Sequence, residues 1–231
     1  MSHVFSPPPV VSVPVVGRQE TFPVHRIYCV GRNYAAHARE MGFTGREPPF
    51  FFLKPADALV VVSGPTPTVL PYPGLTADLH HEIECVVAIG KGGRDISAVD
   101  AAQHIFGYAV GIDLTRRDLQ ASMKQQGRPW CIGKAFDQSA PMGPITEAAQ
   151  AGDLSDAAIW LAVNGHERQR STLGELIWRI PEVIEHLSRA WELQPGDLIF
   201  TGTPEGVGSL VRGDVVTAGV DHLTDIAIKI A

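Results

Sequence analysis

The stretch DLHHEIECVVAIG, residues 78–90, carries the strongest information about the fold. Side chains on a β-strand alternate between its two faces, so Glu82 and Glu84 point to the same side. Their face continues into Val86 and Ala88, and the alternate residues of the stretch are also apolar. A strand that is apolar on both faces is typical of a strand covered on both sides. We therefore expect the stretch at 78–90 to form a strand that is covered on both sides.

The paired glutamates are unusual in such a strand. Two ionised carboxylates about 7 Å apart repel each other by roughly 2 kcal/mol at an effective dielectric constant of 20, before any cost of desolvation. A proton, an arginine or lysine, a metal ion, or water at a sheet edge could offset this repulsion. This stretch by itself is equally compatible with ordinary surface charge at a solvated strand end.

Composition limits the classes of function. The chain has 231 residues, of which 45% are hydrophobic and 19% charged, as is usual for a globular protein with one sizeable core. A net charge of −6 argues against nucleic acid as the main partner. Its three cysteines are far apart and form no CxxC pair, which suggests a reducing compartment and no structural zinc site of the cysteine type.

The first 24 residues are interrupted by several prolines and predict an extended arm that packs on the domain or on a second subunit. They do not resemble a signal peptide, and no apolar run approaches the roughly 20 residues needed to span a membrane. We expect a cytoplasmic protein, without membrane contact, in which residues 25–231 form a single domain.

Local patterns predict more strands than helices. Strands are expected at 26–31 and 107–113, and a hairpin with an Asn-Gly turn at 158–170. Short helices are expected at 33–42 and 98–106, and the main helical region at 171–193. Because helices and strands do not alternate regularly, the pattern favours a strand-dominated α+β fold over a doubly wound sheet.

A third acidic residue, Asp113, lies where the apolar strand at 107–113 gives way to a charged segment. Three carboxylates without cysteine ligands suit a hard divalent cation such as Mg²⁺ or Mn²⁺. His80 shares the strand face of Glu82 and Glu84, so a zinc or iron site with a histidine ligand remains an alternative. His81 points to the opposite face and is the weaker ligand candidate.

Three further features carry possible chemistry. His37 and Glu40 share a helix face and could form a base and its orienting group, although most such pairs are exposed ion pairs. Lys134 follows an apolar stretch and is either a partly buried cation or an exposed one. The loop TGTPEGVG, residues 201–208, could bring Thr203 to a ligand or could be a tight hairpin connection.

Six segments in order resemble the fumarylacetoacetate hydrolase family, and especially its small acylpyruvate-cleaving members. The resemblance covers about residues 25–231 and leaves the arm outside it. The matching segments are YCVGRNYAAHAREMG (28–42), FFLKP (51–55), HHEIE (80–84), GYAVGIDLTRRDLQ (107–120), GRPWCIGKAFD (127–137) and PGDLIFTGTPEGVG (195–208).

The resemblance implies a mixed β-sheet roll, usually in a homodimer, with Mg²⁺ or Mn²⁺ held by three carboxylates. By motif these ligands are Glu82, Glu84 and Asp113. His37 and Glu40 match the pair that activates water, and Lys134 matches the catalytic lysine. These positions show no departure from the family pattern.

Substrate contacts are implied at Arg117, Gln120 and Thr203, with Arg116 as the alternative to Arg117. The segment GFTGREP, residues 42–48, is expected to sense the acyl end of a small oxo-acid substrate.

The implied activity is hydrolysis of the carbon–carbon bond of an acylpyruvate such as fumarylpyruvate, in the breakdown of aromatic compounds. Oxaloacetate decarboxylation, or isomerisation or decarboxylation of a ring-cleavage product, would use the same site. A non-catalytic metal-binding or assembly protein is the alternative from another class. A dinucleotide enzyme is disfavoured because no GxGxxG follows the first strand.

Overall fold

A computed structural model of the chain describes residues 3–34 and 46–231. Within these residues, the largest element is an eight-stranded sheet in which β12 pairs with β9 beside the main strand path. Its strands, in spatial order, are β4 (Phe50–Lys54), β3 (Ile27–Gly31), β15 (Leu198–Phe200), β8 (Ile83–Ile89), β9 (Ile105–Ile112), β11 (Ala140–Met142) and β5 (Leu59–Val61), with β12 (Thr146–Glu147).

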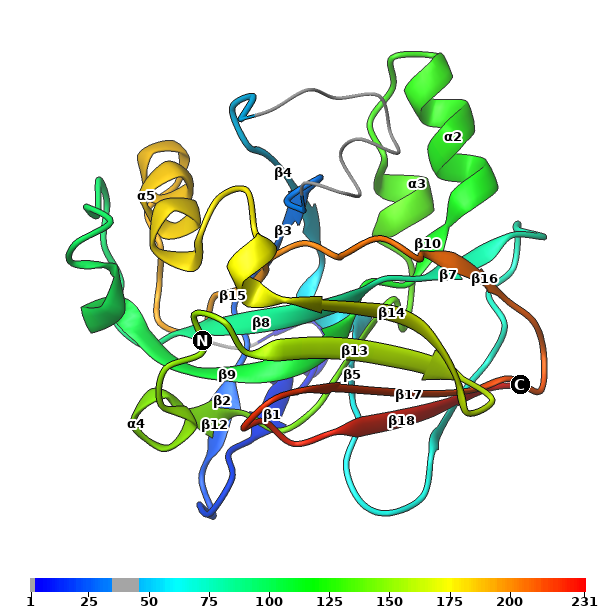
Figure 1. Cartoon of the computed structure of the whole chain (residues 1–231), viewed down its shortest axis with the longest axis horizontal. Coiled ribbons are helices and arrows are strands. Elements are labelled where there is room, and N and C mark those ends of the chain that lie inside the picture. The colour runs from blue at the N-terminus through cyan, green and yellow to red at the C-terminus, as the bar shows by residue number, and fades with distance from the viewer. Residues whose placement is uncertain (1–2, 35–45) are drawn as a thin grey trace.

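A five-stranded sheet packs against the large sheet and lies in front of it in Figure 1. Its strands are β14 (His166–Thr172), β13 (Ala158–Val163), β17 (Val215–Val220), β18 (Ile226–Ile230) and β6 (Thr68–Leu70). Two smaller sheets complete the strand structure. They are β10 (Thr115–Arg116), β7 (Leu79–His81) and β16 (Gly208–Leu210), and the pair β1 (Ser12–Pro14) and β2 (Thr21–Pro23).

The described helices are short and lie around the sheets. In Figure 1, α2, α3 and α5 stand along one side of the molecule, and α4 lies on the opposite side. The α-helices are α2 (Arg117–Gln125), α3 (Cys131–Lys134), α4 (Ala148–Ala151) and α5 (Ile180–Ala190). The 3₁₀ turns are η1 (Ala56–Ala58), η2 (Ala101–His104) and η3 (Leu173–Glu175). None of the helices in the described part of the chain is long and apolar enough to cross a membrane.

Strand pairing is mixed. The pairs β3–β15, β5–β11 and β6–β18 are parallel, whereas β8 pairs antiparallel with both of its neighbours, β15 and β9. The structure therefore confirms the predicted α+β class, with a strand-rich mixed sheet that curls into a roll.

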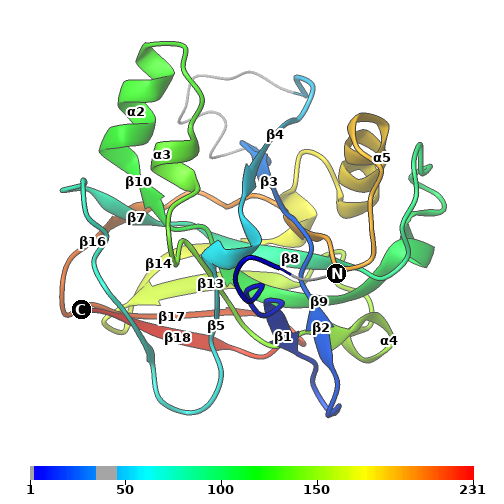
Figure 2. The same cartoon turned by 180° about the vertical axis from the view of Figure 1, so that it is seen from behind.

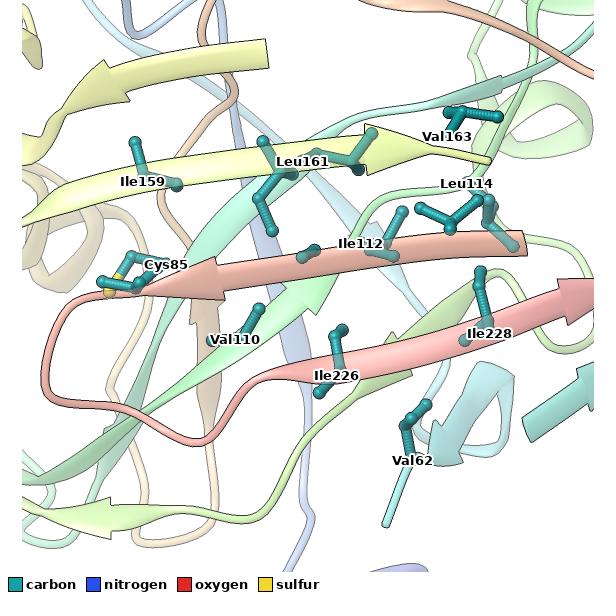
Figure 3. Close-up of a cluster of buried hydrophobic side chains, with 14 of the residues drawn as sticks. Val62, Cys85, Val110, Ile112, Leu114, Ile159, Leu161, Val163, Ile226 and Ile228 are labelled. Atoms are coloured by element: carbon teal, nitrogen blue, oxygen red, sulfur yellow. The ribbon is translucent and has the colours of Figure 1, made fainter. Parts of the chain in front are cut away.

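Strand β8 lies at the centre of the large sheet, and every residue from Ile83 to Ile89 is buried. On one face Val86 and Ala88 pack in a cluster with residues of β1 and β2. On the other face, Cys85 joins the cluster between the large sheet and the five-stranded sheet (Figure 3). The prediction that this strand is covered on both sides is confirmed.

The core between the two large sheets consists mainly of branched aliphatic side chains. Figure 3 shows Val110 and Ile112 of β9 facing Ile159 and Leu161 of β13, with Ile226 of β18 beside them. Alternate residues of β13 are buried, as expected for a strand with one face on the core. This packing gives the carboxyl end of β9 a fixed position, where Asp113 follows.

The proline-rich segment folds into a short hairpin of β1 and β2, near the large sheet in Figure 2. Val13, Val15 and Phe22 are buried in the cluster that also contains Val86 and Ala88. The isolated bridge between Val15 and Ile145 extends this contact. The hairpin thus packs on its own chain, whereas residues 3–10 are exposed.

Several local predictions can be compared with the described residues. The hairpin at 158–170 is confirmed, with Asn164 and Gly165 both at positive φ, as its two-residue turn requires. The helix predicted at 98–106 is wrong, because β9 begins at Ile105 and leaves only the short η2 turn. The main helix is shorter than the predicted 171–193 and has Pro181 in its first turn. The helix predicted at 33–42 falls largely outside the described residues.

Candidate metal and substrate site

Three carboxylates meet where two neighbouring strands of the large sheet end. Glu82 and Glu84 lie at the junction of β7 and β8, and Asp113 follows β9 directly. The backbone N–H of Asp113 donates to the carbonyl oxygen of Glu82 at 2.8 Å, which joins the two strand ends. One carboxylate oxygen from each residue lies within 4.8 Å of the others, and all three side chains are buried. The sequence-predicted ligand set is thus brought together.

Lys134 lies among these carboxylates. Its Nζ donates to Glu82 Oε2 at 2.8 Å, to Asp113 Oδ2 at 2.6 Å and to the Thr115 hydroxyl at 2.6 Å. The short helix α3 carries this lysine, and its side chain is buried. The alternative of an exposed lysine is therefore wrong.

A second buried lysine, Lys54, was not singled out from the sequence. Its Nζ donates to the carbonyl oxygens of Leu114 and Lys134 and lies 2.9 Å from Asp113 Oδ1. Lys54 ends the apolar run FFFLK of β4 and is 1% exposed. A charged residue that closes an apolar strand could have indicated it, but its partners are distant in the sequence.

Helix α2 places Arg117 and Gln120 at the same cavity. Arg117 forms an ion pair with Glu82 and donates from Nη1 to Gln120 Oε1 at 2.5 Å. Arg116 instead stacks on Phe136, with its guanidinium carbon 4.3 Å from the ring centroid, and donates to Ile132 O at 3.3 Å. Of the two alternatives, Arg117 is the one that lines the cavity with the carboxylates.

His80 lies beside the acidic group but both of its ring nitrogens have other partners. Nε2 contacts Asp78 Oδ1 at 2.8 Å, and Nδ1 accepts a hydrogen bond from Arg117 Nε at 3.3 Å. The group of possible ligands among the described residues contains the three carboxylates without a histidine. The geometry therefore does not favour the alternative site with a histidine ligand.

The loop at 201–208 closes another side of the cavity. The Gly202 N–H donates to Glu84 Oε2 at 2.6 Å, and Gly202 has a φ of +103°. A β-carbon here would approach that of Asn33 to 2.7 Å, so this close contact suits glycine. The next residue, Thr203, is buried and lines the cavity.

The charges of the site act on one another strongly. Burial raises the pKa of Glu82, but Lys134 and Arg117 outweigh it and hold that pKa well below its usual range. Burial, with Asp113 and Glu82 nearby, raises the pKa of Glu84 well above normal. Burial lowers the pKa of Lys134, but Asp113 and Glu82 outweigh it and raise that pKa. Further positive charge close to Glu84 would therefore favour its ionised form.

The donor set fits a hard divalent cation. Carboxylate oxygens are the ligands that Mg²⁺ and Mn²⁺ prefer. Asp113 Oδ1 is buried without a hydrogen bond, because Lys54 approaches it without hydrogen-bond geometry, so it keeps lone pairs for a cation. The raised pKa of Glu84 also fits a cation at this place, since positive charge would stabilise the ionised form of that carboxyl group.

Aromatic side chains form part of the cavity wall, and the sequence reasoning missed them. Phe50 and Phe52 of β4 contact Trp130, with ring centroids 5.2 and 6.0 Å apart, respectively. All three line the cavity. A cavity lined by both charged and aromatic side chains suits a ligand with one anionic and one less polar end.

The proposed water-activating residues, His37 and Glu40, lie outside the described residues. Of the segment 42–48, only residues 46–48 are described. There Arg46 donates to Glu182 at 2.5 Å and stacks over Trp178, with its guanidinium carbon 4.3 Å from the ring centroid. The contact with Glu182 joins the end of the segment to α5, and the contact with Trp178 joins it to the residues just before that helix.

Comparison with known proteins adds to this geometry. The family model for the fumarylacetoacetate (FAA) hydrolase C-terminal region matches residues 26–231. A crystal structure of fumarylpyruvate hydrolase from Pseudomonas aeruginosa, in complex with Mn²⁺ and pyruvate, is 55% identical. It covers 100% of this chain and 99% of its own, with a TM-score of 0.97.

Two curated relatives are named for activities on oxaloacetate. An oxaloacetate tautomerase of Escherichia coli, YcgM, is 40% identical over 87% of this chain and 90% of its own length. A mitochondrial oxaloacetate decarboxylase of Dictyostelium discoideum is 37% identical over 89% of this chain and 93% of its own length. Similar chains thus act on different oxo acids.

Proposed function

Because this chain belongs to the fumarylacetoacetate hydrolase family, we propose that it is a metal-dependent hydrolase that cleaves an acylpyruvate. The substrate is fumarylpyruvate or a close relative, and the products are pyruvate and a carboxylic acid. One observation carries the proposal: the three carboxylates, Lys134 and Arg117 line the same cavity. The likeness to a fumarylpyruvate hydrolase along the whole chain supports this choice of substrate.

The metal proposed is Mg²⁺ or Mn²⁺. Held by Glu82, Glu84 and Asp113, it would supply positive charge that polarises the oxygens of the oxo acid. The presence of Mn²⁺ in the structure of the Pseudomonas aeruginosa protein supports this assignment.

Arg117, Gln120 and Thr203 are proposed to bind the carboxylate and oxo oxygens of the pyruvate part. Arg117 is a donor-only cation, and the Gln120 amide and Thr203 hydroxyl can also donate to anionic oxygen. All three line the cavity that contains the carboxylates. The aromatic wall of Phe50, Phe52 and Trp130 would lie along the acyl chain.

The chemical step needs water and a stabilised leaving group. We assign water activation to His37 and Glu40, a kind of general-base help worth about 10²–10⁴-fold. Water adds to the acyl carbonyl, the bond between that carbon and the methylene carbon breaks, and the electron pair forms the enolate of pyruvate. The three N–H groups of Lys134 donate to Glu82, Asp113 and Thr115 in this structure, so one of these hydrogen bonds is exchanged for one to the enolate oxygen, whose charge the ammonium stabilises. A proton then returns to the methylene carbon, giving one pyruvate and one carboxylic acid.

A second candidate, chemistry on oxaloacetate, is favoured by the two curated relatives. Tautomerisation or decarboxylation of oxaloacetate also passes through an enolate that Lys134 could stabilise, and neither needs attack by water. The two functions therefore differ in whether His37 and Glu40 activate water, rather than in the carboxylate group.

A pyruvate-release assay on Mn²⁺-loaded protein separates these candidates. Fumarylpyruvate, acetylpyruvate and oxaloacetate are offered in parallel, with chelator-treated protein and the Glu82→Gln variant as controls. We expect chelator-sensitive release that is fastest from an acylpyruvate and is lost in the variant. Faster release from oxaloacetate, or rapid loss of its enol absorbance without pyruvate release, would instead assign the second function.

A further inference from the structure

A buried glutamine, Gln169, connects the two halves of the site. It lies on β14, where His166, Glu167, Arg168 and Arg170 are exposed, yet Gln169 itself is 1% exposed. On one side it contacts the β7–β8 junction that carries Glu82, and on the other the loop that carries Thr203. Neither the sequence motifs nor the proposed function assigns this residue a role.

The hydrogen bonds of Gln169 fix the orientation of its amide. Its Oε1 accepts from the Ile83 N–H at 3.2 Å, and its Nε2 donates to the Pro204 carbonyl at 2.9 Å. A backbone N–H can only donate and a carbonyl can only accept, so the amide oxygen and nitrogen cannot be exchanged. The other two contacts follow from this orientation. His81 Nδ1, at 2.9 Å from Oε1, carries a proton and donates it.

The same reasoning determines the role of the Thr203 hydroxyl. Gln169 Nε2 lies 2.8 Å from Thr203 Oγ1, and an amide nitrogen is donor-only. Thr203 Oγ1 therefore accepts this bond, which leaves its own hydrogen for another partner. Among the described residues, no group accepts a hydrogen bond from this hydroxyl, and Thr203 lines the cavity with Arg117 and Lys134.

We propose that Gln169 is a positioning residue that makes the Thr203 hydroxyl a hydrogen-bond donor to the anionic oxygens of the oxo-acid substrate. This inference rests on the function proposed above, because that function places the pyruvate part next to Thr203. Gln169 acts through Thr203 and does not itself line the cavity. The alternative to be tested is a purely structural role, in which Gln169 only holds the 201–208 loop in place through its hydrogen bonds to Thr203 and Pro204.

Gln169→Glu separates these two roles because it keeps the side chain nearly the same size. A carboxylate still accepts from Ile83 and His81 but can no longer donate to Thr203. It would accept the Thr203 hydrogen instead and turn the hydroxyl away from the substrate. Gln169→Met removes every hydrogen bond, so the hydroxyl is free to rotate but is not turned away.

The experiment is calorimetric titration of pyruvate into Mn²⁺-loaded protein, with Mn²⁺ affinity measured separately. We expect Gln169→Glu and Thr203→Val each to weaken pyruvate binding at least tenfold. The double variant should bind pyruvate no more weakly than either single variant. Thr203→Ser should bind nearly as wild type, because it keeps the hydroxyl. Mn²⁺ affinity should change less than threefold in all of these variants, and Gln150→Glu, at an exposed position on α4, should bind like wild type.

Three outcomes would overturn the inference. The first is wild-type pyruvate affinity in Gln169→Glu. The second is a double variant whose loss of pyruvate affinity equals the product of the two single losses, because a purely structural role of Gln169 would be independent of the Thr203 hydroxyl. The third applies if Gln169→Glu does not fold and Gln169→Met is measured instead. A loss of pyruvate affinity smaller than that of Thr203→Val then supports the inference, and a larger loss contradicts it. If wild-type protein binds Mn²⁺ but not pyruvate, the proposed function itself fails.

Discussion

The ammonium of Lys134 lies 2.6 Å from Asp113 Oδ2, among the carboxylates that we propose as metal ligands. It also donates to Glu82 at 2.8 Å, so one lysine contacts two of the three proposed ligands. A divalent cation bound by these carboxylates would lie close to the positive charge of Lys134 and be repelled by it. The lysine that is proposed to serve the reaction is therefore also expected to oppose metal binding.

Lys134→Met tests this opposition. Removing a buried positive charge from beside the ligands should tighten Mn²⁺ binding at least tenfold, or about 1.4 kcal/mol, while hydrolysis is lost. Calorimetric Mn²⁺ titration measures the first effect and pyruvate release the second. Lys124→Met, at an exposed position on α2, is the matched control and should change neither. Weaker Mn²⁺ binding in Lys134→Met would show that the lysine orders the ligands more than it opposes the ion.

Lys54 provides the second prediction, on stability. Its side chain is fully buried and lies 2.9 Å from Asp113 Oδ1, so Lys54→Met would leave a buried carboxylate short of positive charge. Loss of one partner from a buried ion pair costs about 3–5 kcal/mol. Urea unfolding should report this loss, and saturating Mn²⁺ should recover part of it, because an ion that binds only the folded state stabilises it. A loss no larger than that of exposed Lys124→Met would refute this role for Lys54.

The sequence predicted which residues would form the acidic group, but not how its charge is balanced. Glu82 and Glu84 are two residues apart on one strand, and Asp113 follows the neighbouring strand, so their motifs and spacing predicted a common site. Lys54 and Gln169 were missed because their partners are distant in the sequence. Lys54 contacts the carbonyl of Lys134, 80 residues away, and Gln169 contacts His81, 88 residues away. Such contacts depend on how the sheets pack, which local periodicity does not encode.

The same limit explains the wrong helix at 98–106. Its residues have acceptable helix propensity, but Ile105 pairs with Ile89 beyond a register shift between Ala88 and Ile89. Phe106 also packs on Phe22, with ring centroids 5.4 Å apart. Tertiary pairing thus overrides a weak local preference.

Asp118 provides a prediction of pH dependence. In the first turn of α2, its carboxylate accepts from the Thr76 hydroxyl at 2.6 Å and from the N–H groups of Ala77 and Leu119 at 3.1 and 2.8 Å. Burial raises the pKa of Asp118, but these hydrogen bonds together lower it. The folded-state pKa is therefore below the unfolded value. Its contribution to stability is present above the unfolded pKa and is lost as pH falls through the folded pKa.

We expect Asp118→Asn to cost about 1 kcal/mol near neutral pH, because this side chain is exposed and water compensates part of the loss. The difference from wild type should shrink as the pH falls below the ordinary range for aspartate. Urea unfolding of both proteins between pH 2.5 and 7 (roughly the range over which a carboxyl titrates) measures it. A difference that stays constant across this range would contradict the assigned cause.

Gly202 provides the last prediction, which concerns the geometry around Glu84. Its N–H donates to Glu84 Oε2, its φ is +103°, and an added β-carbon would meet Asn33 Cβ at 2.7 Å. Gly202→Ala therefore combines two costs: about 1–3 kcal/mol for backbone strain and about 1–3 kcal/mol for overpacking. Gly213→Ala is the matched control, because Gly213 has a φ of +96° but nothing within 4 Å of a β-carbon. Gly213→Ala should therefore lose only the stability that backbone strain costs, without the cost of overpacking.

The two alanine variants should also differ in metal affinity. Relief of the contact with Asn33 requires movement of the Gly202 N–H, and with it the hydrogen bond that orients Glu84. We expect Gly202→Ala to weaken Mn²⁺ binding at least tenfold and Gly213→Ala to leave it unchanged, as measured by calorimetric titration beside urea unfolding. Equal stability loss in the two variants would mean that the loop at 201–208 moves enough to accommodate the new side chain without a clash. Unchanged Mn²⁺ affinity in Gly202→Ala would mean that this N–H does not determine the position of Glu84.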